Sequence, residues 1–404
     1  MSERDADASG RDSAVSERDA DVVVSLQDVD VHFEDESGGF LNFFSEPDTV
    51  HAVDNVSLDI HENEVISLVG ESGCGKTTLG KTAIGLQRPT AGSVEYRGQD
   101  IWEANDGRGE IEIAHWDIRR ALQIIHQDPG SSLNPNRKVI NILASPLKKW
   151  QRHLSRADRI ARILGMLERV GMSPAEDYAY RYPHQLSGGE KQRIALIRAL
   201  LMNPDVILAD EAISALDVSL RIEMMDLMHE LQAQFDTSFL FISHDFSNAR
   251  YFTEKVGGRI GVMYLGQLVE IGPAKQIVED PQHPYTRALR WATPDFDPES
   301  QSGEMPIRKI DIPDPVDPPS GCRFHTRCPE AREHCASTMP DTYTVGSRSV
   351  RCFRARESDH DYWDSPPIED DPDETAHRST VDSSTEESMA AVDSSTEESE
   401  STGD

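Results

Sequence analysis

Residues 70–78 have the sequence Gly70-Glu71-Ser72-Gly73-Cys74-Gly75-Lys76-Thr77-Thr78, which matches the pattern G-x-x-x-x-G-K-S/T. The stretch follows the apolar run 64–69 and precedes a helical pattern, the context that supports this motif. Its glycines let backbone N–H groups point at phosphate oxygens, and the start of the following helix adds partial positive charge. Lys76 can then reach the β- and γ-phosphates of a nucleotide, and the Thr77 hydroxyl can ligate Mg²⁺. A plain strand-to-helix turn would not need this Lys-Thr pair, so we expect a phosphate-binding loop.

Strand and helix patterns alternate on both sides of this loop. Such alternation favours an α/β fold with a mainly parallel sheet. The predicted strands are 22–26, 29–33, 64–69, 206–209 and 238–242, and the predicted helices include 155–170, 189–202 and 219–235.

Three polar residues follow predicted strands at the edge where α/β sheets place their ligands. Asp210 ends the apolar strand 206–209, where a carboxylate can hold Mg²⁺, usually through water. Glu211 comes next and can orient or deprotonate the water that attacks the γ-phosphate. His244 follows the strand 238–242; a lone histidine is more often structural, but its position beside a second strand of the phosphate site favours a functional role.

A second glycine-bearing helix start lies at Leu186-Ser187-Gly188-Gly189-Glu190. Ser187 is a good N-cap, and Glu190 three residues later can complete a capping box. Two glycines after the cap weaken the helix but leave its N-terminus open to close approach. We expect a second anion site here. Because one nucleotide already fills the phosphate loop, a second anion site on the same chain indicates that a second molecule takes part in binding.

With these motifs in order, the chain resembles an ATP-binding-cassette ATPase of the transporter type. The family's five motifs match the loop 70–78, Gln127, 186–190, Asp210-Glu211 and His244. The resemblance implies a P-loop core carrying a helical subdomain, here about 131–188. It also implies that two chains pair head to tail, so that each ATP lies between one chain's phosphate loop and the other's Ser187-Gly188-Gly189.

The same resemblance assigns roles to single residues. Gln127 would contact Mg²⁺ or water and sense the membrane partner, and His244 would hold the γ-phosphate. Asp217, in the stretch 214–217, would cross the dimer interface. The family's usual Pro-Thr or Pro-Val after the catalytic Glu is replaced by Ala212-Ile213, which removes no catalytic group. The adenine-stacking aromatic is unclear because of the insertion 35–49, with Phe43, Phe44 and His51 as candidates that could equally be packing or solvent-facing residues.

Three further stretches, 125–135, 262–266 and 281–289, resemble the oligopeptide/dipeptide importer subfamily, and the similarity covers about 22–356. It implies an ATPase that drives uptake of peptides through two transmembrane permeases, with an extracellular substrate-binding protein as an indirect partner. A second, different ATPase subunit is expected, hence a heterodimer on the cytoplasmic face of the cell membrane. Oligosaccharides or nickel are alternative cargoes, and a soluble cassette acting on nucleic acid or ribosomes is an alternative class. The acidic chain, with one motif set, disfavours a nucleic-acid partner.

Four cysteines cluster near the C-terminal end, at Cys322, Cys328, Cys335 and Cys352. In a cytosolic protein, clustered cysteines indicate metal ligands rather than disulfides. The spacing lacks the two-residue gap of a typical zinc finger. Four thiolates suit a 4Fe–4S iron–sulfur cluster or Zn²⁺, and the segment around Cys322 also resembles the C-terminal extension of peptide-importer ATPases. Four reduced structural cysteines are the alternative.

Charge and repeats divide the rest of the chain. The net charge is −32 over 404 residues, of which the two ends, 1–21 and 357–404, carry −4 and −16 and the middle −12. Both ends contain short repeats too polar to bury a core, so we expect them to be disordered. Between them we expect an ATPase domain at 22–270 and an extension at 271–356.

Two classes of protein are disfavoured by the same composition. No apolar run approaches the length of a membrane-spanning helix, and the N-terminus lacks a signal pattern, so we expect a cytoplasmic chain. Arginine far outnumbers lysine and the middle is itself acidic, which favours a halophilic protein in a salt-rich cytoplasm over an ordinary protein with acidic tails.

Overall fold

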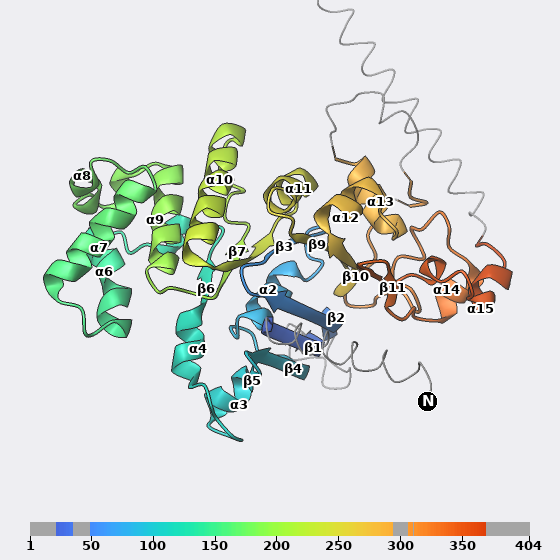
Figure 1. Ribbon diagram of the computed structural model, residues 1–404. Coiled ribbons are helices and arrows are strands. Elements are labelled where there is room, and N and C mark those ends of the chain that lie inside the picture. Colours follow the sequence, from blue (N-terminus) through green and yellow to red (C-terminus); the bar gives the residue numbers. More distant parts are fainter. Residues whose placement is uncertain (1–21, 35–48, 294–305, 310, 369–404) are drawn as a thin grey trace, which may run out of the picture.

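The protein is represented by a computed structural model that describes residues 22–34, 49–293, 306–309 and 311–368. Figure 1 shows a central α/β region, a group of helices on one side (green) and the C-terminal segment on the other (orange to red). The predicted disorder of 1–21 and of 369–404 lies outside the described residues, as do Phe43 and Phe44.

The central sheet has eight strands in the order β11-β12-β10-β9-β3-β8-β7-β6. The five strands from β9 to β6 in this order are parallel, which confirms the predicted α/β core. The short strands β3, β7 and β8 are buried along their whole length, as their continuous apolar sequences require. The parallel strands are β3 (Val65–Val69), β6 (Leu122–Ile125), β7 (Val206–Asp210), β8 (Ser238–Ile242) and β9 (Arg259–Tyr264).

A second, antiparallel sheet packs against the first in the order β2-β1-β4-β5. Its strands are β1 (Val22–Glu34), β2 (Thr49–His61), β4 (Ala91–Tyr96) and β5 (Gln99–Asp100). The two strands expected at 22–26 and 29–33 form the single strand β1, because a bulge at Asp28, with φ +47°, joins them without a turn. Helix α2 (Lys76–Ala83) shares one hydrophobic core with both sheets.

Helices between β6 and β7 form a lobe on one side of the central sheet, and its apolar residues belong to one core cluster together with residues of β3, β7 and β8. The helix α7 begins at a Ser155–Asp158 capping box, and α9 begins at the box of Ser187 and Glu190. The elements of this lobe are α5 (Pro129–Ser132), α6 (Val139–Trp150), α7 (Arg156–Arg169), α8 (Ala175–Ala179), η1 (Pro183–Gln185) and α9 (Gly188–Leu200).

Further helices complete the α/β region, and the described residues contain no helix long and apolar enough to cross a bilayer. These helices are α3 (Ile101–Asp106), α4 (His115–Ala121), α10 (Val218–Phe235), α11 (Phe246–Glu254), α12 (Ala274–Glu279) and α13 (Pro284–Trp291).

The C-terminal segment continues the central sheet instead of forming a detached unit. The strand β10 (Gln267–Pro273) crosses the expected boundary at residue 270 and pairs with β12 (Arg348–Val350), which pairs with β11 (Tyr343–Val345). The short helices α14 (Glu333–Ser337) and η3 (Phe353–Ala355) lie in the same segment.

The expectation of disorder from residue 357 onward is wrong for residues 357–368. They include helix α15 (His360–Asp364), in which Tyr362 is only 2% exposed. The Tyr362 side chain packs with Phe353 and Cys335 in a small apolar cluster. The prediction rested on the acidic composition of the stretch and gave too little weight to its two aromatic residues, Tyr362 and Trp363. Their rings supply apolar area that stabilises the folded stretch.

Candidate nucleotide-binding site

The loop 70–78 connects β3 to α2, and its glycines are required by sterics. Gly75 has φ +101°, and a Cβ atom there would lie 2.0 Å from the carbonyl oxygen of Ala52. At Gly70, φ is +151° and a Cβ would lie 2.2 Å from the carbonyl oxygen of Met263. The buried Lys76 donates hydrogen bonds of 2.8 Å to the carbonyls of Gly70 and Glu71. The loop thus folds back over the ammonium group beside the start of a helix, the geometry of an anion-binding turn.

Two oxygen ligands suited to Mg²⁺ lie together next to this loop. The Thr77 hydroxyl, in the first turn of α2, donates a 2.8 Å hydrogen bond to a carboxylate oxygen of Asp210. Asp210 is the last residue of β7 and is 8% exposed. Hydroxyl and carboxylate oxygens are the donors that Mg²⁺ accepts beside substrate phosphates, so the donor set fits this ion.

Glu211 gathers two of the other predicted residues around its carboxylate. The amide of Gln127, which follows β6, donates to Glu211 Oε2 at 3.1 Å, and His244 Nδ1, which follows β8, lies 3.5 Å from the same oxygen. Neighbouring strand ends therefore bring together three side chains that are distant in sequence. Glu211 itself has φ +47°, a left-handed conformation uncommon for a residue with a side chain.

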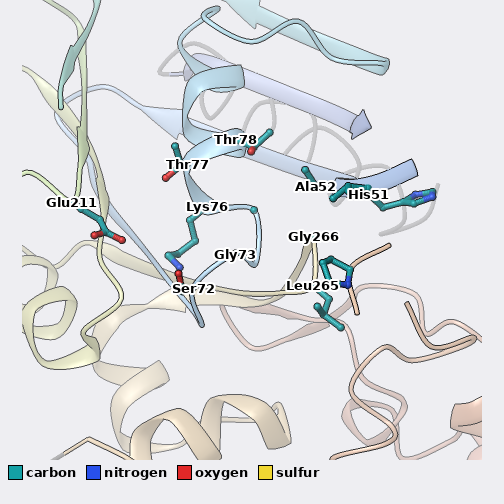
Figure 2. A pocket seen from close by; sticks show the side chains of 13 residues that line it. His51, Ala52, Ser72, Gly73, Lys76, Thr77, Thr78, Glu211, Leu265 and Gly266 are labelled. Atoms are coloured by element: carbon teal, nitrogen blue, oxygen red, sulfur yellow. The ribbon is translucent and has the colours of Figure 1, made fainter. Parts of the chain in front are cut away.

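A pocket of about 200 Å³ runs from Glu211 across the loop to the antiparallel sheet. Figure 2 shows Glu211 pointing toward Lys76 at one end and His51 with Leu265 at the other. Of the three adenine-stacking candidates, His51 lines the pocket, whereas Phe43 and Phe44 lie outside the described residues. Burial and the neighbouring His32 ring, 4.2 Å away, lower the pKa of His51. Sequence reasoning missed Leu265 and Pro315, which are adjacent to this end only through the fold.

The residues Ser187, Gly188 and Gly189 do not line this pocket. They begin α9, where Ser187 and Glu190 exchange capping hydrogen bonds, and a Cβ atom at Gly188 would meet open space. Asp217 caps α10 by accepting a hydrogen bond from Leu220 N at 3.0 Å. The residues at the starts of α9 and α10 therefore lie on other elements than this chain's phosphate loop. The expectation that they complement the loop of a second chain stays a prediction.

The four cysteines line one pocket, together with Phe324 and Tyr362. All four are free thiols. Burial raises the pKa of Cys322 to about 12 and that of Cys352 to about 11, and it also raises the pKa values of Cys328 and Cys335. Within the described ranges, no three His, Cys, Asp or Glu side chains are close enough to hold one metal ion.

One contact with the nucleotide loop has no signal in the sequence. Arg327, beside Cys328, forms an ion pair with Glu71 across 256 positions of the chain. The hydroxyl of Tyr285 also accepts a hydrogen bond from Glu71 N at 3.0 Å. No local pattern could predict these pairs, because only the sheet topology brings the C-terminal segment beside β3.

Comparisons with known proteins agree with this geometry. A family model described as ABC transporter matches residues 53–214, and one described as oligopeptide/dipeptide transporter, C-terminal region, matches 269–335. The oligopeptide transport ATP-binding protein AppF of Bacillus subtilis is 39% identical over 80% of this chain and 93% of its own. The oligopeptide transport ATP-binding protein OppF of Salmonella typhimurium is 38% identical over 82% and 96%.

A solved structure provides a three-dimensional counterpart. It is the dimeric post-hydrolysis state of the ATP-binding cassette MJ0796 bound to ADP and Pi, with a TM-score of 0.51, 28% identity, and coverage of 62% of this chain and 98% of that one. The sequence match and the site geometry thus agree, and the chain belongs to the ABC transporter family, as an ATPase subunit with an oligopeptide/dipeptide-transporter C-terminal region.

Proposed function

We propose that this chain is the ATP-hydrolysing subunit of an importer that takes up dipeptides or oligopeptides through partner permeases. The observation that carries the proposal is the gathering of Gln127, Glu211 and His244 opposite Lys76, in a chain whose C-terminal region matches that of oligopeptide/dipeptide transporters. The curated relatives named as peptide transport ATP-binding proteins support the cargo class.

Each residue of the site has a role in this proposal. Lys76, which donates to the carbonyls of Gly70 and Glu71, holds the β- and γ-phosphates, with backbone groups of 70–78 around them. Thr77 and Asp210 would hold Mg²⁺, and Gln127 would contact the ion or its water; the charge of the ion would offset that of the phosphates. Glu211 orients the attacking water and accepts its proton, and His244 contacts the γ-phosphate.

The site is completed by a second cassette in the proposed assembly. The open N-terminus of α9, with Ser187, Gly188 and Gly189, would contact the nucleotide on the partner's loop, and Asp217 would cross the interface. We propose a heterodimer with a different ATPase subunit, on the cytoplasmic face of the membrane. ATP favours the closed dimer and so drives the permeases, a helix from each of which would dock near Gln127, and an extracellular binding protein would supply the substrate.

We also propose that the four-cysteine pocket holds a 4Fe–4S cluster, with zinc as the alternative. Four free thiols around one pocket, two of them buried and two partly buried, fit a group bound by four thiolates, and bound iron would offset the cost of burying those charges. Anaerobic purification followed by iron, sulfide and zinc analysis tests this; a colourless protein free of both metals would refute it.

A salt-rich cytoplasm is a further part of the proposal. The net charge of −32 implies strong self-repulsion at low ionic strength, which salt screens. The temperature of unfolding should therefore rise steadily with KCl concentration. A temperature of unfolding indifferent to KCl would contradict a halophilic origin.

The transport function is tested by purifying the tagged chain from membranes in high-salt buffer and identifying co-purifying proteins by mass spectrometry. We expect two multi-span permeases and a second cassette ATPase, after which the neighbouring binding protein is screened against peptides, oligosaccharides and nickel. Recovery only as a soluble protein with ribosomes or nucleic acid would refute the transport function and leave the ATPase chemistry intact.

A further inference from the structure

The four-cysteine segment is the stretch 322–352, which contains the four clustered cysteines. Two of its buried arginines contact residues of the nucleotide-binding site. Arg327 is 5% exposed and donates two hydrogen bonds to the Glu71 carboxylate, Nη1 to Oε2 at 2.9 Å and Nη2 to Oε1 at 3.0 Å. This two-pronged, charge-assisted arrangement is the strongest and most directional form of an Arg–carboxylate pair. It joins the turn between Cys322 and Cys328 to the second residue of the phosphate loop.

Glu71 transmits this contact to the reacting end of the site. Its carbonyl accepts a 2.8 Å hydrogen bond from Lys76 Nζ and a 3.3 Å hydrogen bond from Cys74 N. Its own N–H donates to the hydroxyl of Tyr285, a residue that is 1% exposed. The side chain, the N–H and the carbonyl of Glu71 are therefore all held in place, and the carbonyl is a hydrogen-bond partner of Lys76, the residue proposed to contact the phosphates.

Arg323 makes a second contact between the four-cysteine segment and the pocket, at the end lined by His51 and Leu265. It is 6% exposed and donates to the carbonyl of Leu265 and to the carboxylate of Asp54. Leu265 and Gly266 line the pocket, and Gly266 N donates a 3.0 Å hydrogen bond to the carbonyl of Cys74 in the phosphate loop. The four-cysteine segment thus contacts the loop directly through Arg327 and indirectly through the turn at 265–266.

We propose that Arg327 is a positioning residue for nucleotide binding, with Arg323 as its second anchor, so that the folded four-cysteine segment sets the affinity of the phosphate loop for ATP. This inference rests on the proposed ATPase function of the loop, and it assigns the C-terminal segment a role at that site. It requires no metal: the contacts are made by the arginine side chains.

Loss of the ion pair should weaken binding more than it slows the chemical step. Without Arg327, Glu71 can rotate into solvent, since its side chain is already 24% exposed, and the loop must be ordered again each time a nucleotide binds. Once ATP is bound, its phosphates hold the loop, and Glu211, Gln127 and His244 remain in place. The Kd and KM for ATP should rise while kcat is nearly preserved.

The test uses the full-length chain and the variants Arg327→Gln, Arg327→Lys, and Arg327→Gln combined with Glu71→Gln. Calorimetry with Mg-ATP and with ADP should give a Kd about 5- to 10-fold higher for Arg327→Gln, a typical size for coupling between linked sites. Arg327→Lys keeps the charge but not the fork, so it should fold and show a smaller increase. The double variant should bind no more weakly than Arg327→Gln, because both changes remove one interaction.

The control is Arg332→Gln, since Arg332 lies in the same segment and donates to the carbonyls of Trp363 and Ser365, away from the loop. An unchanged Kd in folded Arg327→Gln and Arg327→Lys would refute the proposal, as would an equal increase in Arg332→Gln. In the assembled transporter, a fall in kcat with unchanged KM would also refute it. Absence of nucleotide binding by the unaltered chain would instead refute the proposed ATPase function.

Discussion

Glu211 is the residue at which local strain and proposed chemistry coincide. The left-handed backbone of Glu211 costs free energy relative to an ordinary backbone conformation. Such conformations persist where surrounding contacts enforce them. Here Glu211 N donates to the carbonyl of Ile242 at 3.2 Å, which ties the residue to the end of β8. The result is a carboxylate directed at the same region as Gln127 and His244.

The variant Glu211→Gln should separate binding from turnover. Glutamine keeps the size of the side chain but cannot accept a proton from water, so hydrolysis should fall by at least about 100-fold while ATP affinity stays within about twofold. Phosphate release and nucleotide calorimetry measure the two quantities. Glu254→Gln, on the exposed end of α11, is the control; near-normal turnover of Glu211→Gln would contradict its assignment as general base.

His229 gives a pH dependence with a defined sign. It is 7% exposed, stacks on Phe252 at 4.5 Å, and its Nε2 donates to the carbonyl of Phe252 at 2.7 Å. Burial lowers the pKa of His229 from 6.5, and the positive charge of Lys255 lowers it further. The negative charge of Asp226 acts in the opposite direction but does not offset burial. A lowered pKa means that the neutral form stabilises the fold fully above pH 6.5 and that this stability is lost as pH falls below that value.

The corresponding prediction compares the native chain with His229→Gln, which can keep the hydrogen bond but does not titrate. The native chain should lose free energy of unfolding relative to the variant as pH falls from about 7.5 to 5, measured by urea denaturation. A difference independent of pH would show that His229 titrates alike in the folded and unfolded chain.

Among the elements, the N-terminus of α9 is unusual in having a complete cap and an open approach. Ser187 and Glu190 satisfy backbone donors reciprocally, so the helix starts well despite Gly188 and Gly189. A side chain at Gly188 would meet nothing within 4 Å in this chain. The glycine is therefore not required by the folded monomer, which agrees with the proposed contact to a partner's nucleotide.

Gly188→Val should leave the folded chain and its own nucleotide binding intact but block the composite site. We expect an unchanged temperature of unfolding, an unchanged Kd for ATP, and at least about a tenfold fall in turnover of the assembled transporter, because the partner nucleotide loses its close helix end. Gly165→Val, at an equally open position of α7, is the matched control. Normal turnover in Gly188→Val would contradict the head-to-tail arrangement.

At the scale of the whole molecule, the C-terminal segment pairs with the central sheet through β12, and its last described residues pack back against residues 330 and 331. The Tyr362 hydroxyl donates to the carbonyl of Glu330 at 3.1 Å, and Ile368 N donates to the carbonyl of Ala331 at 3.0 Å. Residues 357–368 thus cover the side of the four-cysteine pocket that Tyr362 lines.

A chain ending at residue 356 should be less stable than one ending at 368. Removing the buried Tyr362 and its hydrogen bonds should lower the temperature of unfolding by roughly 5 °C. Calorimetry of the two truncated chains at the same salt concentration measures the difference. Equal unfolding temperatures would show that α15 contributes nothing to stability.

Local sequence patterns alone predict the phosphate loop, the strands at 64–69, 206–209 and 238–242, the helix at 155–170 and the helix start at Ser187. These features are local: glycine sterics, apolar runs and capping boxes act within a few residues. The sequence also determined the resemblance from which the family and the roles of Gln127, Glu211 and His244 were predicted.

Which residues from separate parts of the sequence come into contact depends on how the whole chain folds. The tertiary structure joined β1 across the Asp28 bulge, ordered 357–368 around Tyr362, and placed Arg327 against Glu71. Such contacts depend on strand pairing and burial, which join residues that are not neighbours in the sequence, Arg327 and Glu71 across 256 positions, and leave no period in it. The neighbourhood of the phosphate loop is therefore a property of the whole fold, whereas the loop's chemistry is already encoded in nine consecutive residues, 70–78.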